Sequence, residues 1–170
     1  MKRRDAFELY RDYLIANEGL ATSTGLSSLL DNNLKHDYIS DSLGQEGLDK
    51  KAFWKEVKPF VRIIENEEGV ISIDDTIIKK PHSNENNIIN YHFDHTSGKS
   101  VKGINLLNFL LSSEYEGQTV NSPLAFHIVQ KSQTYIDKNG KTKRKSDVSK
   151  NEVVLEQLKC LTFQNQIKYK

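Results

Sequence analysis

The sequence predicts an α+β protein in which a helical module precedes an antiparallel sheet and a closing helix. Two observations support this order. Apolar residues recur at spacings of three and four as far as Ile64, and apolar, β-branched runs begin at Val70. A domain boundary is therefore expected near residue 66, with residues 1–66 in the helical module and residues 67–170 in the sheet domain.

Four short helices are expected in the helical module. Each carries apolar residues at helical spacing and stops at a residue or run that favours turns. The first is expected over residues 4–17, and the second ends at Leu30 after one of the possible N-caps Thr22, Ser23 and Thr24. The third is expected from the possible N-cap Asp37 to Leu43, and the fourth from Asp49 to Ile64. The breaks between them are expected at Gly19, Asp31-Asn32-Asn33, Gly44 and Gly47. Pro59 should kink the last helix without preventing it.

Three strands are expected to follow, as an antiparallel meander. They are expected at residues 70–73, 101–111 and 124–129. A polar loop rich in Asn and His (residues 82–98) and a turn-like segment (residues 112–123) would separate them. Ser149 can then cap a helix that reaches about Gln164, and a parallel strand would begin near Lys168.

The overall charge excludes a globally basic surface. The net charge is +1, with 36% hydrophobic and 28% charged residues, so we expect a folded chain with a thin core and any nucleic-acid surface must be local. Residues 131–150 contain seven basic and two acidic residues, a local excess of five positive charges. The sequence therefore predicts a basic patch in this segment.

The chain is expected to be cytoplasmic and to have no membrane partner. Cys160 is its only cysteine, which excludes an internal disulfide, suits a reducing cytosol and predicts a half-buried helical residue. Glu8, Arg11 and Asp12 interrupt the first apolar residues, so no signal peptide is expected. The apolar stretch at residues 104–111 is too short to span a membrane.

Asp74 and Asp75 are the sharpest local indication of chemistry. They follow an apolar run, so we expect them at the carboxyl end of a strand, directed at the sheet edge. Carboxylate oxygens are the ligands that Mg²⁺ prefers, and paired ions stabilise the attacking and leaving oxygens of phosphoryl transfer. The alternative is an ordinary strand-to-loop turn, for which Asp-Asp-Thr is common.

A resemblance to a known family is carried by the stretch Val70-Ile71-Ser72-Ile73-Asp74-Asp75-Thr76-Ile77-Ile78-Lys79-Lys80-Pro81. It resembles the first catalytic strand of bacterial insertion-sequence transposases of the DDE superfamily. Residues 20–43 are similar to the amino-terminal segment of the same enzymes. The resemblance implies a ribonuclease-H-like catalytic domain, here truncated to three antiparallel strands plus a helix, after a helical and possibly DNA-binding module.

The family cuts and joins DNA at mobile-element ends by two-metal phosphoryl transfer, and it needs an Asp on the first strand, an Asp on the fourth strand and a Glu on a later helix. The resemblance assigns the first acid to Asp75 as catalytic residue and metal ligand. Asp74 is the competitor, because adjacent strand residues face opposite sides. It also implies Mg²⁺ in the complete enzyme, DNA at transposon ends as partner, and a second copy or a full-length transposase as a further partner. A fragment with one acid of three is expected to be inactive alone.

Eight basic residues are candidate phosphate contacts. They are Lys79 and Lys80 in the turn after the first strand, Lys99 and Lys102, and the run Lys141, Lys143, Arg144 and Lys145. The turn dipeptide Asn139-Gly140 precedes this run, so the alternative is an exposed loop tip.

Other functions are weighed against the transposase. A helix-turn-helix at residues 20–43 would make the chain a non-catalytic module that binds DNA or a partner protein, although Lys35 and His36 are nearly its only positive groups. His82, His92 and His95 invite a zinc site, but His92 and His95 would face opposite sides of a strand. An aspartyl phosphatase would need Asp-x-Asp, whereas these two acids are adjacent.

Overall fold

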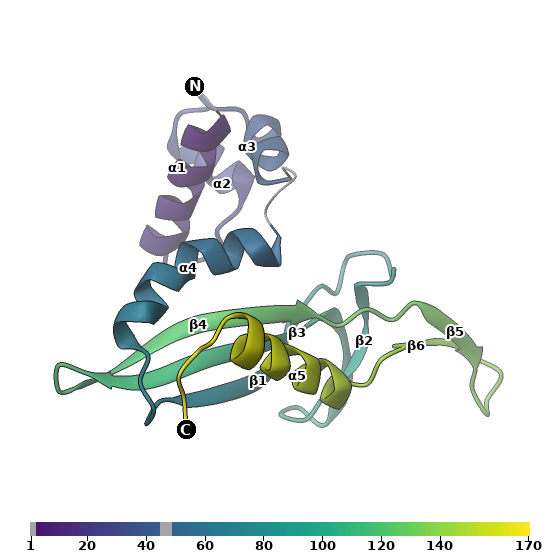
Figure 1. Cartoon of the computed structure of the whole chain (residues 1–170). Helices are drawn as coiled ribbons and strands as arrows, with labels where there is room; N and C mark the ends of the chain where they lie inside the picture. Colours follow the sequence, from purple (N-terminus) through teal and green to yellow (C-terminus); the bar gives the residue numbers. More distant parts are fainter. Residues whose placement is uncertain (1–2, 45–48) are drawn as a thin grey trace. The chain divides into compact units, whose positions relative to one another are not determined.

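The computed structural model describes residues 3–44 and 49–170 of an α+β protein with antiparallel sheets (Figure 1). The chain divides into two units, Met1–Asp49 and Lys50–Lys170. The break expected at Gly47 lies outside the described residues. Among those residues, no helix is both long enough and apolar enough to cross a membrane.

The first unit contains helices α1 (Arg3–Ala16), α2 (Ser23–Leu29) and α3 (His36–Leu43). Their buried apolar contacts are Ala6, Leu26 and Ile39, each at most 1% exposed. The Thr22 side chain caps α2 by accepting a hydrogen bond of 2.9 Å from the Gly25 backbone N–H, as the sequence predicts.

The prediction of Asp37 as the N-cap of α3 is wrong. Lys35 is the N-cap residue, with extended backbone and no side-chain cap. Asp37 lies in the first helical turn instead, where its negative charge stabilises the helix dipole.

Helix α4 (Lys50–Ile64) belongs to the second unit, whereas the expected domain boundary lies near residue 66. The helix continues through Pro59. Its Val61 and Ile64 are buried in the same core as the strand residues, because the apolar stripe of α4 packs against the sheet.

The main sheet is organised around β3 (Lys99–Tyr115). Strands β1 (Val70–Lys79) and β4 (Gln118–Ile128) both pair with the same residues of β3, so they lie on its opposite edges. Strand β2 (Ile89–Asp94) pairs with the first part of β3, on the β4 edge. All of these pairings are antiparallel.

Two predicted loops are wrong. The segment 82–98, expected as a polar loop, contains β2, and most of the segment 112–123, expected as a turn, lies within β3 and β4. Polar residues are accommodated there by cross-strand bonds, such as the 2.6 Å bond from Ser112 Oγ to Asn121 Oδ1. The actual turn is Glu116-Gly117, whose φ angles of 50° and 76° suit a two-residue hairpin.

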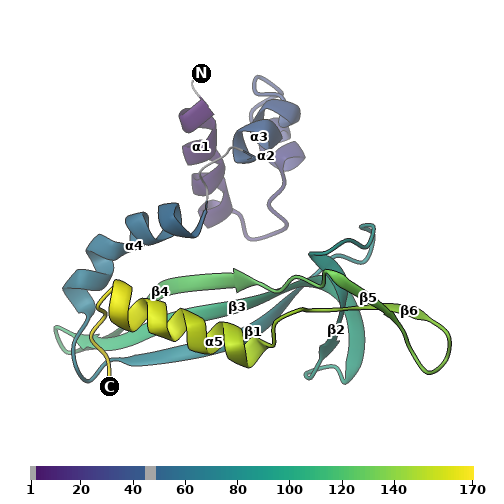
Figure 2. The ribbon, with the colours of Figure 1, turned by 45° about the vertical axis from the view of Figure 1, so that its right-hand side comes forward.

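Helix α5 (Lys150–Lys159) and the π-helical turn η1 (Cys160–Gln164) lie along one face of this sheet (Figures 1 and 2). Ser149 begins α5 in a capping box with Glu152, which confirms the predicted N-cap. Cys160 is half-buried and helical, as expected. The core on this face consists of Val61, Ile64, Leu107, Phe109, Leu111, Leu124, Val129, Val153, Leu161 and Ile167.

Two further features complete the second unit. Strands β5 (Gln133–Ile136) and β6 (Thr142–Lys145) form a separate hairpin, and Gly140 in its loop has φ 74°, which confirms the turn expected at Asn139-Gly140. After η1 the chain returns to the start of β1, where the Lys170 N–H donates to the Gly69 carbonyl at 2.7 Å.

Candidate functional site

Asp74 and Asp75 lie in the middle of β1, where they pair with Asn108 and Leu107 of β3. The expectation that they end the strand is wrong. The β-branched residues Ile77 and Ile78 continue the ladder as far as Lys79, so the strand absorbs both acids.

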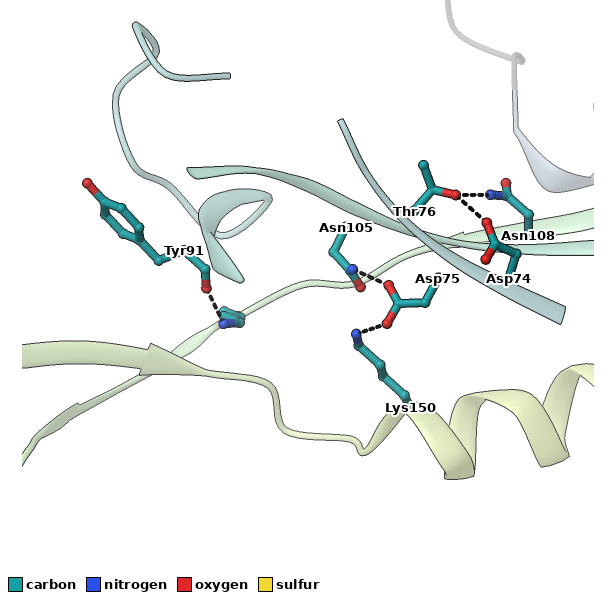
Figure 3. Close-up of polar contacts among 8 residues, drawn as sticks. Asp74, Asp75, Thr76, Tyr91, Asn105, Asn108 and Lys150 are labelled. Atoms are coloured by element: carbon teal, nitrogen blue, oxygen red, sulfur yellow. Dashed lines mark hydrogen bonds and ion pairs between the residues drawn. The ribbon is translucent and has the colours of Figure 1, made fainter. Parts of the chain in front are cut away.

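The two carboxylates face opposite sides of the sheet, as adjacent strand residues must (Figure 3). Asp75 lies on the face that α5 covers, between Asn105 and Lys150. The Asn105 Nδ2 group donates to Asp75 Oδ1, and the Lys150 ammonium pairs with Asp75 Oδ2. The two acids therefore cannot act together on one ligand, as an Asp-x-Asp phosphatase pair would.

Asp74 lies on the other face in a small exposed network. Thr76 Oγ1 donates to Asp74 Oδ2 at 2.6 Å, and Asn108 Nδ2 donates to Thr76 Oγ1 at 3.3 Å. Thr76 of the same strand thus satisfies this carboxylate at the surface, and Asn108 of β3 in turn bonds to Thr76. Such a network is ordinary for an exposed sheet position.

Two buried polar atoms near Asp75 have no hydrogen-bond partner in the structure. Asn105 is 0% exposed and its Oδ1 is unpartnered, while His92 is 5% exposed and its Nε2 is unpartnered. Buried polar atoms are nearly always bonded, so each exception needs an explanation. Both are atoms that can bind a cation or a donor group.

Positive charges crowd this region. Burial, together with the charges of the nearby Lys131 and Lys150, lowers the pKa of His92 to about 4, against the attraction of Asp75. Burial, together with the charge of Lys150, also lowers the pKa of Lys131. His92 is therefore neutral at physiological pH.

Strands β1 and β3 approach each other closely beside this cluster of Asp75, Asn105 and His92. A Cβ at Gly103 would lie 2.4 Å from the Ile78 carbonyl oxygen, so only glycine fits there. Beside it, a cleft of about 450 Å³ follows β1 and is lined by Asp74, Asp75, Thr76, Ile77 and residues 93–96. Asp75 is therefore reachable from solvent, and 40% of its side chain is exposed.

The predicted phosphate contacts form two groups. Lys79, Lys80, Lys99 and Lys102 lie where β1 ends and β3 begins. Lys141, Lys143 and Arg144 line a second cleft beside the β5–β6 hairpin, and Lys145 ends β6.

Sequence reasoning did not select Asn105, Lys131 or Lys150, and it weighed His92 only for zinc. The available signal was Asn105, a polar residue within the apolar run of residues 104–111. Lys150 follows its partner Asp75 by 75 residues, so no local pattern links them.

No protein-family model, curated protein or solved structure matches this chain. Within residues 3–44 and 49–170, no three His, Cys, Asp or Glu side chains are grouped so that they could hold a metal ion.

Proposed function

We propose that the second unit is the opening part of a ribonuclease-H-like catalytic domain in a DDE-type transposase, with Asp75 as its first acid. The observation that carries the proposal is the topology around β1. Strands β4, β3 and β1 lie in that order, all antiparallel, and α5 follows them. After α5 the chain returns to the start of β1, on the edge that does not pair with β3. There the Lys170 N–H donates to the Gly69 carbonyl.

The residues around Asp75 fit a hard cation in part. The Asp75 carboxylate and the unpartnered Asn105 Oδ1 are both oxygen ligands of the kind that Mg²⁺ prefers. Lys150 already supplies a positive charge to this carboxylate, so a metal ion would have to displace its ammonium. When bound, Mg²⁺ would stabilise charge on the oxygens of a transferring phosphoryl group.

In this proposal the parent enzyme cuts DNA at mobile-element ends and joins it to a target. Asp75 holds the metal ion, and the second Asp and the Glu of the family have no assigned counterpart in the sequence. We therefore expect the chain by itself to show no Mg²⁺- or Mn²⁺-dependent nicking of DNA. Reproducible cleavage that Asp75→Ala abolishes would contradict this inactivity.

Metal binding at Asp75 can be tested on the full chain by adding Mn²⁺ and following paramagnetic broadening of backbone amide signals. We expect broadening around residues 75 and 105 in the unsubstituted chain and in Asp74→Asn, and at least a tenfold weaker response in Asp75→Asn. Asp74→Asn is the matched control, since it removes the neighbouring charge on the opposite face. Equal losses in both variants, or broadening elsewhere, would defeat the assignment of Asp75.

A second candidate function is a non-catalytic module that binds DNA or a full-length transposase. It is favoured by the separate first unit, in which α2 and α3 are joined by a tight turn with Asp31 and Asn32 at positive φ. The coding sequence after Lys170 distinguishes the two functions. A continuation that encodes an apolar strand ending in Asp supports the enzyme, whereas its absence favours the module.

A further inference from the structure

A cleft of the second unit, the hairpin cleft, lies between β2 and the β5–β6 hairpin. Its volume is about 670 Å³. Its walls include Tyr91, Phe93, Tyr135, Lys141 and Arg144. Aromatic rings from two strands therefore share one cleft with cationic side chains.

The three aromatic residues are unusually exposed for their size. Tyr91 is 49% exposed, Phe93 56% and Tyr135 42%. None of them belongs to the apolar core on the α5 face. Their ring surfaces are therefore available to a flat ligand.

The charge of the cleft is positive. Lys131, Lys141, Lys143 and Arg144 line it against the single acid Glu85. Lys143 is paired with Asp137 at 2.8 Å. Among the ion pairs of the described residues, none includes Lys141, so its charge can act on a bound anion.

The walls of the cleft are held together by specific bonds. Arg144 Nη1 donates to Asn87 Oδ1 at 2.8 Å, and the Lys131 N–H donates to the Asn87 carbonyl at 2.7 Å. The Lys131 ammonium also donates to the Tyr91 carbonyl at 2.5 Å. The hairpin is thus fixed to β2 and to the segment before it, which lowers the entropy lost on binding.

Phe93 connects this cleft to the one beside Asp75, because it lines both. The two clefts therefore adjoin at Phe93.

We propose that the hairpin cleft binds unpaired nucleotides of a single nucleic-acid strand. Bases stack on the exposed rings, while Lys141 and Arg144 contact phosphates. A duplex keeps its base faces stacked inside, so it cannot use the rings. Binding of a strand in the cleft does not depend on the transposase proposal. Only the placement of a reacting phosphate of that strand beside Asp75 rests on the transposase proposal.

The test uses the full chain and a fluorescently labelled oligothymidylate, with a duplex of the same length as comparison, in an anisotropy titration at fixed salt. We expect the single strand to bind more tightly, Tyr135→Ala to weaken it about tenfold, and Tyr135→Phe to stay within about twofold, because phenylalanine still stacks. Tyr115→Ala is the matched control, since Tyr115 is 38% exposed and does not line the cleft.

Several results would overturn the proposal: no binding by the unsubstituted chain, duplex binding as tight as single-strand binding, or equal losses in Tyr135→Ala and Tyr115→Ala. Photocrosslinking of an oligonucleotide carrying 5-iododeoxyuridine to the unsubstituted chain gives a second readout that needs no folded variant. Adducts are expected at Tyr91, Phe93 or Tyr135, and adducts only elsewhere would exclude the cleft. The metal site is tested separately by Mn²⁺ broadening, so failure of the metal site and failure of the cleft are separable.

Discussion

The two faces of the sheet formed by β1 and β3 differ in what their polar residues do. On the α5 face, Leu107, Phe109 and Leu111 are at most 3% exposed, and Asn105 and His92 at its end have unpartnered buried atoms. On the other face, Leu106 and Leu110 are only half-buried, and Asp74, Thr76 and Asn108 bond to one another. The covered face therefore holds both the main core and the unexplained polar atoms.

This difference separates two acids that the sequence places side by side. Asp74 is satisfied locally by the Thr76 hydroxyl at the surface. Asp75 faces a cluster in which two buried polar atoms, Asn105 Oδ1 and His92 Nε2, have no hydrogen-bond partner. A buried group that lacks a partner is better evidence of a ligand site than an exposed acid with ordinary hydrogen bonds.

The largest expected effect compares adjacent leucines on the two faces. Leu111→Ala should lower the free energy of unfolding by about 3 kcal/mol, because it empties a fully buried site, whereas Leu110→Ala should cost about 1 kcal/mol. Urea denaturation followed by circular dichroism measures both. Similar losses of unfolding free energy for the two variants would mean that the face carrying Leu110 is also covered. The two faces would then not differ in burial.

The next effect concerns His92. Its folded pKa of about 4 is below the unfolded value of about 6.5, so the unfolded chain takes up the proton first as the pH falls. This histidine thus contributes stability that is present above pH 6.5 and is lost between about pH 6.5 and 4, by at most about 3 kcal/mol. His92→Gln should reduce the pH dependence of urea unfolding over this range. An unchanged pH profile would place His92 in water rather than in the buried cluster.

The smallest effect tests whether Lys150 occupies the place of a cation. Lys150→Met removes the ammonium from Asp75, so Mn²⁺ affinity should rise about tenfold, or about 1.4 kcal/mol. Stability should change by less than about 1 kcal/mol, because the pair is partly exposed to solvent and is therefore screened. Titration with Mn²⁺ measures the affinity, with Lys138→Met as a control in the hairpin loop. If both variants bind Mn²⁺ like the unsubstituted chain, Lys150 and the metal ion do not compete.

Local patterns predicted much of the fold. The helices of the first unit, the capped α5, the Asn139-Gly140 turn and three of the strands each follow from caps, spacing or β-branched runs within a short segment. The loops were predicted less well. Residues 89–94 and most of residues 112–123 lie in the sheet, where strand partners satisfy their backbones. Local propensity does not identify those partners.

The candidate site divides in the same way. Sequence alone determined that two acids follow an apolar run, that they face opposite sides of any strand, and that residues 131–150 are basic. Only the tertiary structure decided which acid lies beside the buried polar cluster, since the neighbours of Asp75 come from β2, β3 and α5 and are brought to it by strand register and helix packing. Alternation along a strand is a local property of the backbone, but burial, and with it the need for a partner, depends on what other parts of the chain cover.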